Sequence, residues 1–241
     1  MKSKRSNSIC IIIPAFNEES GIPKCVEEIV KVIKKFPRIH LLIVNDGSSD
    51  KTAKILTSLK VKYKTGFSHI THEVNLGYGA ALQTGIKEAY SRGFKFCIFM
   101  DSDLTNHPSF IPKFAELASD DYDCVKASRY TKGGGMVGVP YYRQLISRVG
   151  NLIASTLFGL GIKDCTNGFR MVRLDLIKEI EFKENNFSII LEELYYLKQK
   201  GARVIEIPNT LISRIDTTTN FKYTLRMFWD YFKYALMASL I

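Results

Sequence analysis

The segment KFCIFMDSDLT, residues 95–105, ends an apolar run with two aspartates, Asp101 and Asp103, which are separated by one residue. The apolar run has the length and composition of a strand that is buried on both faces. Open α/β sheets bind their ligands in the crevice beyond the carboxyl ends of the strands. The segment therefore predicts a largely parallel sheet with a polar site at the end of one strand.

Apolar runs and helical periodicity alternate on both sides of this segment. The predicted strands cover residues 8–14, 39–46, 69–74, 95–101, 124–130 and 202–208. The segments between them, most clearly 77–92, 141–161 and 188–200, carry helical patterns. This alternation is typical of an α/β fold with a mainly parallel central sheet flanked by helices. Since no repeat or low-complexity linker interrupts the chain, we expect one domain over residues 1–220 and an aromatic, helical appendage over 221–241.

The composition is that of a globular enzyme with anionic partners. The chain has 241 residues, 46% of them apolar, and a formal net charge of +10 from 34 Lys and Arg against 24 Asp and Glu. Such a charge favours phosphorylated substrates, an acidic membrane surface or nucleic acid. The charge alone does not choose among these three.

The cysteines and the N-terminal segment indicate a reducing compartment. The five cysteines are scattered and lack metal-binding spacing, so we expect reduced core residues. The apolar run after the basic N-terminus is stopped by Pro14 and is too short for a signal peptide. No interior apolar run reaches the roughly 18 residues of a membrane span. We therefore expect the catalytic part to face the cytoplasm.

Two more predicted strands end in polar residues, in PAFNEE (14–19) and NDGSSDKT (45–52). These ends would lie at the same edge of the sheet as the aspartate pair. There Asn17 and Asp46 would offer acceptors to a base or a ribose, and Gly47 allows a close backbone turn. NDGSSD alone also fits an ordinary Asx-type turn with a helix cap, so the prediction of a binding crevice rests on the convergence of the polar strand ends.

The aspartate pair is a candidate metal site. Carboxylates at a strand end can direct their oxygens at one hard cation, for which Mg²⁺ or Mn²⁺ is suited. Such an ion would bridge the phosphates of a nucleotide donor and neutralise charge as a nucleoside diphosphate leaves. Two solvated loop aspartates are the plain alternative for this motif by itself.

Six motifs in order resemble the inverting family 2 glycosyltransferases, in particular their polyprenyl-phosphate (dolichyl-phosphate) mannosyltransferase and glucosyltransferase branch. The motifs are IIIPAFNEE, IVNDGSSDKT, NLGYGAALQTG, MDSDLTNHP, ASRYTKGG and DCTNGFR, within residues 11–208. The resemblance implies a single nucleotide-sugar-binding domain of the glycosyltransferase A type that depends on Mg²⁺ or Mn²⁺. It also implies transfer of a hexose, with inversion, to a polyprenyl or dolichyl phosphate, with GDP-mannose slightly favoured over UDP-glucose as the donor.

The resemblance also implies roles for individual residues. The nucleotide pocket would be formed by two strand ends and the 75–80 loop, with the residues Pro14, Ala15, Asn17, Glu18, Asp46, Gly77 and Gly79. The metal ligands would be Asp101 and Asp103. The donor and acceptor phosphates would be held by Arg129 and Arg143, with Ser147 as a further acceptor contact. Arginine suits this task because its fork of donors matches phosphate oxygens.

Four further residues are placed by the same resemblance. Asn167 and Arg170, in a segment similar to the branch's TSGFR-like signature, would shape the sugar end of the pocket. Glu192 takes the place of an acid on a later helix, with a simple surface carboxylate as the alternative. Arg214 resembles the arginine of a mobile loop that closes over the donor phosphates.

Two stretches depart from the family pattern. Thr105 stands where many relatives carry glutamine as a further contact to the metal, which bears on the strength or choice of metal. Residues 214–221 lack the glycine and lysine that relatives often show after the loop arginine. Loop closure would then work differently, or Lys222 would substitute.

The basic charge and the aromatic chain end together predict a membrane surface as partner. Interfacial helices combine Lys and Arg with Trp, Phe and Leu, as residues 221–241 do. Residues 145–162 would add a second lipid contact. We therefore expect a peripheral or tail-associated protein at the cytoplasmic face of a membrane. The alternative is that the tail packs on its own domain or on a partner, which leaves a homo-oligomer or a membrane partner subunit open.

Other functions were weighed against the resemblance. A family 2 glycosyltransferase with a non-lipid acceptor is the nearest alternative. DSDLT also fits the motif of haloacid-dehalogenase-type phosphatases, but that motif belongs on the first strand of its domain and here three predicted strands precede it. A Rossmann oxidoreductase is disfavoured because the segment around Gly77 and Gly79 lacks the third glycine of the fingerprint. A nucleic-acid partner is not expected, since no recognised nucleic-acid motif accompanies the charge.

Overall fold

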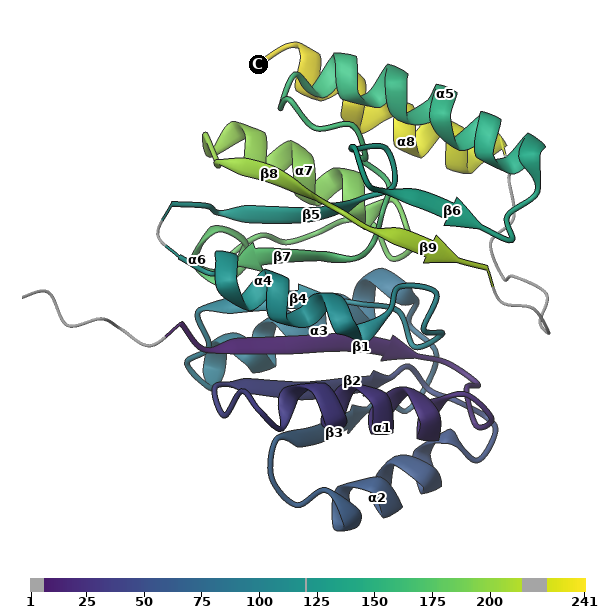
Figure 1. Ribbon diagram of the computed structural model, residues 1–241, viewed down its shortest axis with the longest axis vertical. Coiled ribbons are helices and arrows are strands. Elements are labelled where there is room, and N and C mark those ends of the chain that lie inside the picture. Colours follow the sequence, from purple (N-terminus) through teal and green to yellow (C-terminus); the bar gives the residue numbers. More distant parts are fainter. Residues whose placement is uncertain (1–6, 120, 214–224) are drawn as a thin grey trace, which may run out of the picture.

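Strands and helices alternate along the part of the chain that the computed structural model describes, residues 7–119, 121–213 and 225–241 (Figure 1). The strands are β1 Ile9–Ala15, β2 Ile39–Asn45, β3 Phe67–Thr71, β4 Phe96–Phe99, β5 Cys124–Ser128, β6 Gly135–Val137, β7 Arg170–Arg173, β8 Val204–Pro208 and β9 Thr210–Ile212. The helices are α1 Ile22–Ile33, α2 Thr52–Lys62, α3 Tyr78–Ser91, α4 Ile111–Leu117, α5 Tyr141–Phe158, α6 Leu174–Ile177, α7 Ile189–Gln199 and α8 Leu225–Ser239, with the 3-10 turn η1 Pro108–Phe110.

The main sheet has the strand order β3-β2-β1-β4-β7-β5-β8. Strands β1 to β4 pair in parallel, and so do β5 and β8. Strand β7 runs antiparallel to both of its neighbours, β4 and β5. Helices cover both faces (Figure 1), so the predicted α/β fold with a mainly parallel central sheet is confirmed.

The first strand shows how the sequence builds two cores. Its residues ICIII are buried on both sides of the sheet, and successive side chains point to opposite faces. Ile11 and Ile13 join a core with α1, α2 and α4, while Cys10 and Ile12 join a core with α3, α5, α7 and α8. All five cysteines are free and buried, as predicted.

Helix α1 shows how a helix that covers the sheet begins and which of its residues are buried. Pro23 lies in its first turn, where the missing N–H is not needed. Its buried residues recur every three or four positions and form one stripe against the sheet: Ile22, Cys25, Val26, Ile29 and Ile33.

The structure differs from the predicted elements at one strand in the first half of the chain and at several in the second half. Strand β7 was not predicted, because a four-residue run that begins and ends with arginine does not look buried. The two-stranded sheet of β6 and β9 is too short for a periodicity to show. Strand β3 begins at Phe67, two residues before the predicted start. Residues 214–224, with Arg214, Lys222 and the departures from the family pattern, lie outside the described residues.

The predicted appendage contains a helix, α8, that packs against α5 and α7. Tyr234, Ala235 and Ala238 on one side of α8 belong to the same core as α5. The opposite side exposes Trp229 and Leu236. The helix thus shares the core of the main body, and the division at residue 220 stays a prediction. None of the helices that the structure describes is both long and apolar enough to cross a membrane.

A buried ion pair fixes β7 between β4 and α7. Arg170 Nε and Nη2 donate to the two carboxylate oxygens of Glu193 at 2.6 and 2.9 Å, with side-chain exposures of 0% and 1%. The guanidinium also lies 4.4 Å from the ring centroid of Phe99. Burial alone would lower the pKa of Arg170, but Glu193 outweighs burial and raises that pKa, so the arginine stays charged inside the core. A broken pair would leave an uncompensated ion there.

Glu193→Ala is expected to lower the free energy of unfolding by about 3–5 kcal/mol, because Arg170 would stay buried without its partner. Urea denaturation followed by circular dichroism measures this change. Glu116→Ala removes the partner of Lys113 in an exposed pair and should leave the midpoint unchanged. Equal midpoints for all three proteins would contradict the role given to the buried pair.

Candidate active site

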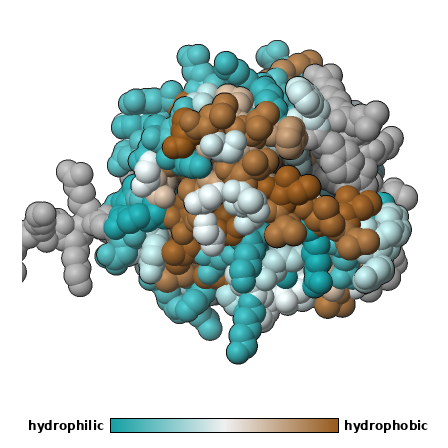
Figure 2. Space-filling model, turned by 90° about the horizontal axis from the view of Figure 1, so that it is seen from above, coloured by the Kyte–Doolittle hydropathy of each residue, from teal (hydrophilic) through white to brown (hydrophobic). Residues whose placement is uncertain are grey.

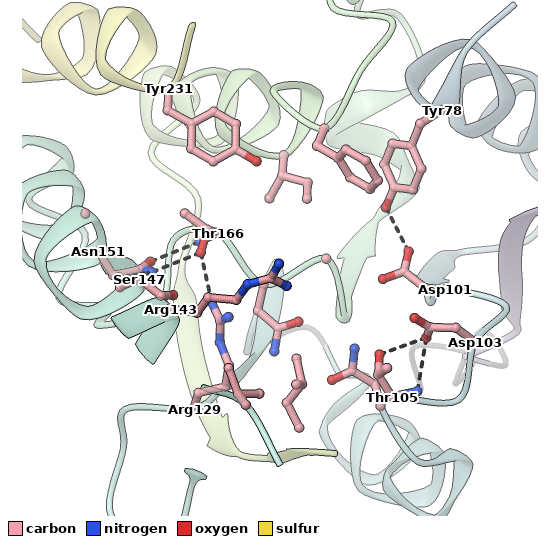
Figure 3. A pocket seen from close by; sticks show the side chains of 18 of the residues that line it. Tyr78, Asp101, Asp103, Thr105, Arg129, Arg143, Ser147, Asn151, Thr166 and Tyr231 are labelled. Atoms are coloured by element: carbon pink, nitrogen blue, oxygen red, sulfur yellow. Dashed lines mark hydrogen bonds between the residues drawn. The ribbon is translucent and has the colours of Figure 1, made fainter. Parts of the chain in front are cut away.

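A cavity of about 1020 Å³ opens at the carboxyl ends of β1, β2 and β4 (Figure 3). Most of the residues singled out in the sequence line it: Pro14, Ala15, Glu18, Asp46, Gly77, Asp101, Asp103, Arg129, Arg143, Ser147 and Asn167. Four others lie outside its lining: Asn17, Gly79, Arg170 and Glu192. Arg214 lies outside the described residues.

The loops after β1 and β2 interlock through Asn17. Its Oδ1 accepts the backbone N–H of Ser49 at 2.8 Å, and its own N–H donates to Ser48 Oγ at 2.9 Å. The Glu18 N–H donates to Thr52 Oγ1 at 2.9 Å. Asn17 has φ of 54°, a conformation that asparagine tolerates better than most residues. The two polar strand ends therefore form one rigid rim, and Asn17 acts on the rim and not in the cavity.

Asp46 fixes the loop that follows β3. Its carboxylate accepts the backbone N–H groups of Leu76 and Gly77 at 2.9 and 2.8 Å. His72 Nδ1 lies 2.8 Å from Asp46 Oδ1, and since an ionised carboxylate can only accept, that nitrogen donates. Gly47, with φ of +66°, allows this approach, because a Cβ there would lie 2.2 Å from the backbone of Val74.

The aspartate pair stands just beyond β4, with one hydroxyl partner for each carboxylate. Asp103 Oδ1 accepts Thr105 N–H at 3.0 Å and Thr105 Oγ1 at 2.8 Å. Tyr78 Oη donates to Asp101 Oδ1 at 3.3 Å. Burial raises the pKa of Tyr78 well above its usual value and the charge of Asp101 adds to this, so the phenol stays protonated and donates. Thr105 thus orients Asp103.

The donor set of the pair fits a hard divalent cation. Both carboxylates line the cavity, and no group of three or more His, Cys, Asp or Glu side chains suited to a metal occurs among the described residues. Mg²⁺ commonly uses one or two carboxylates and completes its shell with water and substrate phosphates. Asp101 and Asp103 therefore suit Mg²⁺ or Mn²⁺ bound together with a phosphorylated ligand.

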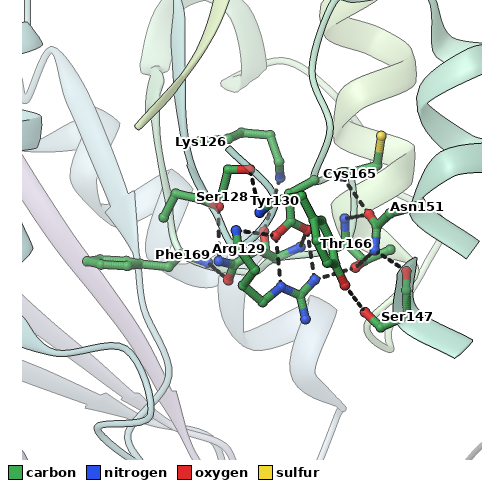
Figure 4. Close-up of polar contacts among 12 residues, drawn as sticks. Lys126, Ser128, Arg129, Tyr130, Ser147, Asn151, Cys165, Thr166 and Phe169 are labelled. Atoms are coloured by element: carbon green, nitrogen blue, oxygen red, sulfur yellow. Dashed lines mark hydrogen bonds and ion pairs between the residues drawn. The ribbon is translucent and has the colours of Figure 1, made fainter. Parts of the chain in front are cut away.

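Arg129 is held by a buried acid (Figure 4). Its Nε and Nη2 donate to the two oxygens of Asp164 at 2.8 and 2.7 Å, and Nη2 also donates to Thr166 Oγ1. Burial alone would raise the pKa of Asp164, but the guanidinium and its hydrogen bonds outweigh burial and hold that pKa below its usual value. Arg143 lies on α5, where its Nε donates to Tyr142 Oη at 3.3 Å.

Asn151 of α5 connects the helix to the segment that contacts Arg129. Its Oδ1 accepts the N–H groups of Cys165 and Thr166, and its Nδ2 donates to Thr166 Oγ1 at 2.9 Å. One turn earlier, Ser147 Oγ accepts a hydrogen bond from Tyr130 Oη at 2.6 Å. Asn151, Asp164 and Thr166 were not among the predicted site residues, although the last two belong to DCTNGFR. Only their hydrogen-bond partners in the structure reveal them.

Glu192 holds a loop in place. Its carboxylate accepts the backbone N–H groups of Lys183 and Glu184 at distances of 2.9 to 3.1 Å. The loop from these residues to Phe187 packs on the start of α3, where Gly79 N–H donates to Asn185 O at 2.9 Å. Glu192 is fully buried and does not line the cavity, so it is neither a surface carboxylate nor a cavity residue.

A second part of the cavity lining is apolar. Its walls come from three helices, with Ile146, Ile153 and Ala154 on α5, Ile190 and Leu191 on α7, and Tyr231, Phe232 and Ala235 on α8. Carboxylates from the end of β4, two arginines and an aliphatic and aromatic groove formed by α5, α7 and α8 therefore line one continuous space. Such a cavity suits a ligand with a charged head and an apolar chain.

The chain matches the family model described as glycosyl transferase family 2 over residues 10–181. It is similar to the polyprenol monophosphomannose synthase of Mycolicibacterium smegmatis, with 27% identity over 208 residues, 85% of this chain and 77% of that protein. It is also similar to the dolichol-phosphate mannosyltransferase of Pyrococcus furiosus, with 31% identity over 206 residues. That alignment covers 84% of this chain but only 56% of the Pyrococcus protein.

Solved structures share the fold. Glucosyl-3-phosphoglycerate synthase from Mycobacterium tuberculosis, in complex with Mn²⁺, UDP and phosphoglyceric acid, superposes with a TM-score of 0.68 at 18% identity. The superposition covers 97% of this chain and 79% of the synthase. A second complex of that synthase, with Mg²⁺ and UDP, gives a TM-score of 0.67 at 17% identity over 98% of this chain and 80% of the other.

Gly79→Ala is expected to destabilise the loop contact at the start of α3, because a Cβ there would lie 2.1 Å from Glu184 O. Overpacking of this kind typically costs about 1–3 kcal/mol in the free energy of unfolding, which urea denaturation measures. Gly150→Ala on α5 is the matched control, since its added Cβ meets open space. An equal loss in both variants would contradict the packing argument.

Proposed function

The chain belongs to glycosyl transferase family 2, and from this premise we propose that it transfers a hexose from a nucleotide sugar to a polyprenyl phosphate with inversion. The observation that carries the proposal is one cavity lined both by the aspartate pair and by apolar side chains of α5, α7 and α8. The phosphatase and oxidoreductase alternatives belong to other families. The aspartate pair also follows the fourth strand along the chain and not the first.

The donor would occupy the polar part of the cavity. The rim formed by Pro14, Ala15 and Glu18, with Asp46 and Gly77, would surround the nucleotide. Bound at Asp101 and Asp103, Mg²⁺ or Mn²⁺ would neutralise the leaving nucleoside diphosphate. The names of the two relatives favour mannose as the sugar, so GDP-mannose is the donor proposed first and UDP-glucose the alternative.

The acceptor phosphate would lie between the donor and the apolar groove. It is ionised at neutral pH, so the reaction needs no strong general base and depends on orientation and charge. A phosphate oxygen attacks the anomeric carbon, and the bond from that carbon to the diphosphate breaks on the opposite face. Arg143 and Ser147 would hold the acceptor phosphate, with Arg129 fixed beside them by Asp164.

The apolar groove would take the first units of the lipid chain. Ile146 and Ile153 on α5 and Phe232 on α8 line it. A polyprenyl chain would bury apolar surface there, whereas a hydrophilic acceptor would leave this groove without a complement. The groove is the reason to prefer a lipid acceptor over a soluble one.

An exposed apolar surface lies over α5 and α8, two of the helices that line this groove (Figure 2). It is formed by one side of α5 and one side of α8: Tyr141, Tyr142, Leu145, Val149, Leu152, Trp229 and Leu236. Arg143, Arg148 and Lys233 are basic residues on the same two helices. Aromatic, aliphatic and basic residues in this combination are typical of helices that lie in a lipid interface. We place the protein peripherally on a membrane, at its cytoplasmic face because the free cysteines suit a reducing compartment.

Wild-type protein is expected to form a lipid-linked product from GDP-mannose, short polyprenyl phosphate and Mg²⁺ or Mn²⁺, with Asp103→Ala reducing the rate about 100-fold or more. Mass spectrometry of the lipid extract follows the product, and NMR assigns its anomeric configuration. The panel includes UDP-glucose, phosphate-free polyprenol and a soluble sugar acceptor.

Asp121→Ala, which removes an exposed carboxylate, is the control and should keep wild-type activity. Full activity of Asp103→Ala would refute the metal assignment. Transfer to the soluble sugar but not to the polyprenyl phosphate would refute the lipid acceptor and favour a non-lipid one.

Leu152→Glu is expected to weaken binding to anionic phospholipid vesicles about tenfold, because it replaces an inserted apolar side chain by a charge. Cosedimentation with vesicles measures the effect. Val61→Glu on α2 is the matched control, since Val61 and Leu152 are each 69% exposed. The interfacial role of α5 would be refuted if both variants bound vesicles as the wild type does.

A further inference from the structure

Tyr78 joins the start of α3 to the aspartate pair (Figure 3). It is the first residue of the helix, lines the cavity, and donates its phenol proton to Asp101 Oδ1 at 3.3 Å. Neither the family motifs nor the sequence patterns assign it a role of its own. Its position matters because a carboxylate rotates readily about its last side-chain bond unless a partner fixes it.

The ring of Tyr78 is itself fixed from two sides. Its centroid lies 4.4 Å from that of Phe187. The backbone on either side of it is pressed against the loop that contains Phe187, because a Cβ on Gly77 would lie 2.4 Å from Asn185 O. That loop is anchored in turn by Glu192. The position of the phenol oxygen beside Asp101 is therefore fixed by the packing of the Tyr78 ring and backbone.

Gly168 closes the same contact from the opposite side. A Cβ there would lie 3.3 Å from Tyr78 Oη and 3.7 Å from Asp101 Oδ2. The first of these distances is tighter than most Cβ contacts, so an alanine would push the phenol away by a few tenths of an ångström, while the second is an ordinary contact. The space between Tyr78 and Asp101 thus depends on a glycine at position 168.

We propose that Tyr78 is a positioning residue that orients the Asp101 carboxylate for a divalent cation, with Gly168 keeping the required space. Hydrogen bonds from outside the coordination sphere commonly orient metal-binding carboxylates in this way. Asp103 has an equivalent hydroxyl partner in Thr105, so among the described contacts a hydroxyl donates to each of the two carboxylates. The inference rests on the proposed function, because it presupposes a cation at Asp101 and Asp103.

The test uses the full chain and measures binding without turnover. Calorimetric titration of GDP, and separately of UDP, at a series of Mn²⁺ concentrations gives the Mn²⁺ concentration that half-saturates nucleotide binding. Tyr78→Phe keeps the ring on Phe187 but removes the hydroxyl, and we expect it to raise that concentration about tenfold. Gly168→Ala should raise it as well by crowding the same contact, and it carries the test if Tyr78→Phe fails to fold.

Tyr90→Phe is the matched control, since it removes a phenol hydroxyl near the other end of α3, where Tyr90 Oη accepts from Lys178. It should bind Mn²⁺ and nucleotide as the wild type does. Wild-type half-saturation in both Tyr78→Phe and Gly168→Ala would overturn this inference and leave the proposed function standing. No Mn²⁺-dependent nucleotide binding by the wild type would overturn the proposed metal site and, with it, the inference.

Discussion

Parallel pairing of β1 with β2 and β4 is the constraint on which the rest of the structure depends. In register, Ala15 lies beside Asn45, and Ile12 beside Phe99. Because parallel strands finish at the same edge, three segments that are far apart in the sequence emerge there together. The interlocked rim, the loop held by Asp46 and the aspartate pair all follow from that edge.

Below the site, the second half of the sheet buries several charges, each with a neutralising or polar partner. Arg129 is paired with Asp164 and Arg170 with Glu193. Lys126 is fully buried and donates to Asn167 O at 3.0 Å; burial, reinforced by the charge of Arg170, lowers its pKa. An unpaired charge here would be costly, so the loop that carries Asn167 has little freedom to shift. These paired charges make the part of the sheet next to the cavity stiff.

The sequence predicted the first half of the fold well because its strands are long apolar runs and its turns carry recognisable polar motifs. Prediction was weaker where charge is buried. Arg170 and Glu192 look like surface or ligand-contacting residues in the sequence, and only the fold shows their partners, Glu193 and the backbone of Lys183. The antiparallel insertion of β7 depends on such a pair and therefore left no periodic signal. The role proposed for Tyr78 could not be predicted from the sequence either, because it depends on a hydrogen bond to Asp101, which lies 23 residues further along the chain.

Helix α5 has apolar residues exposed on one side and, on another, Ser147 and Asn151 in the polar network of Arg129. If its outer side rests on lipid, the thickness of the helix sets the height of the reaction above the bilayer, about 10 Å. An acceptor phosphate would then have to rise out of the headgroup plane by that distance and bring part of its chain with it. Lipids whose chains resist this lift would be poor acceptors however well their phosphate fits, so substrate choice would depend on the mechanics of the membrane as well as on contacts in the cavity.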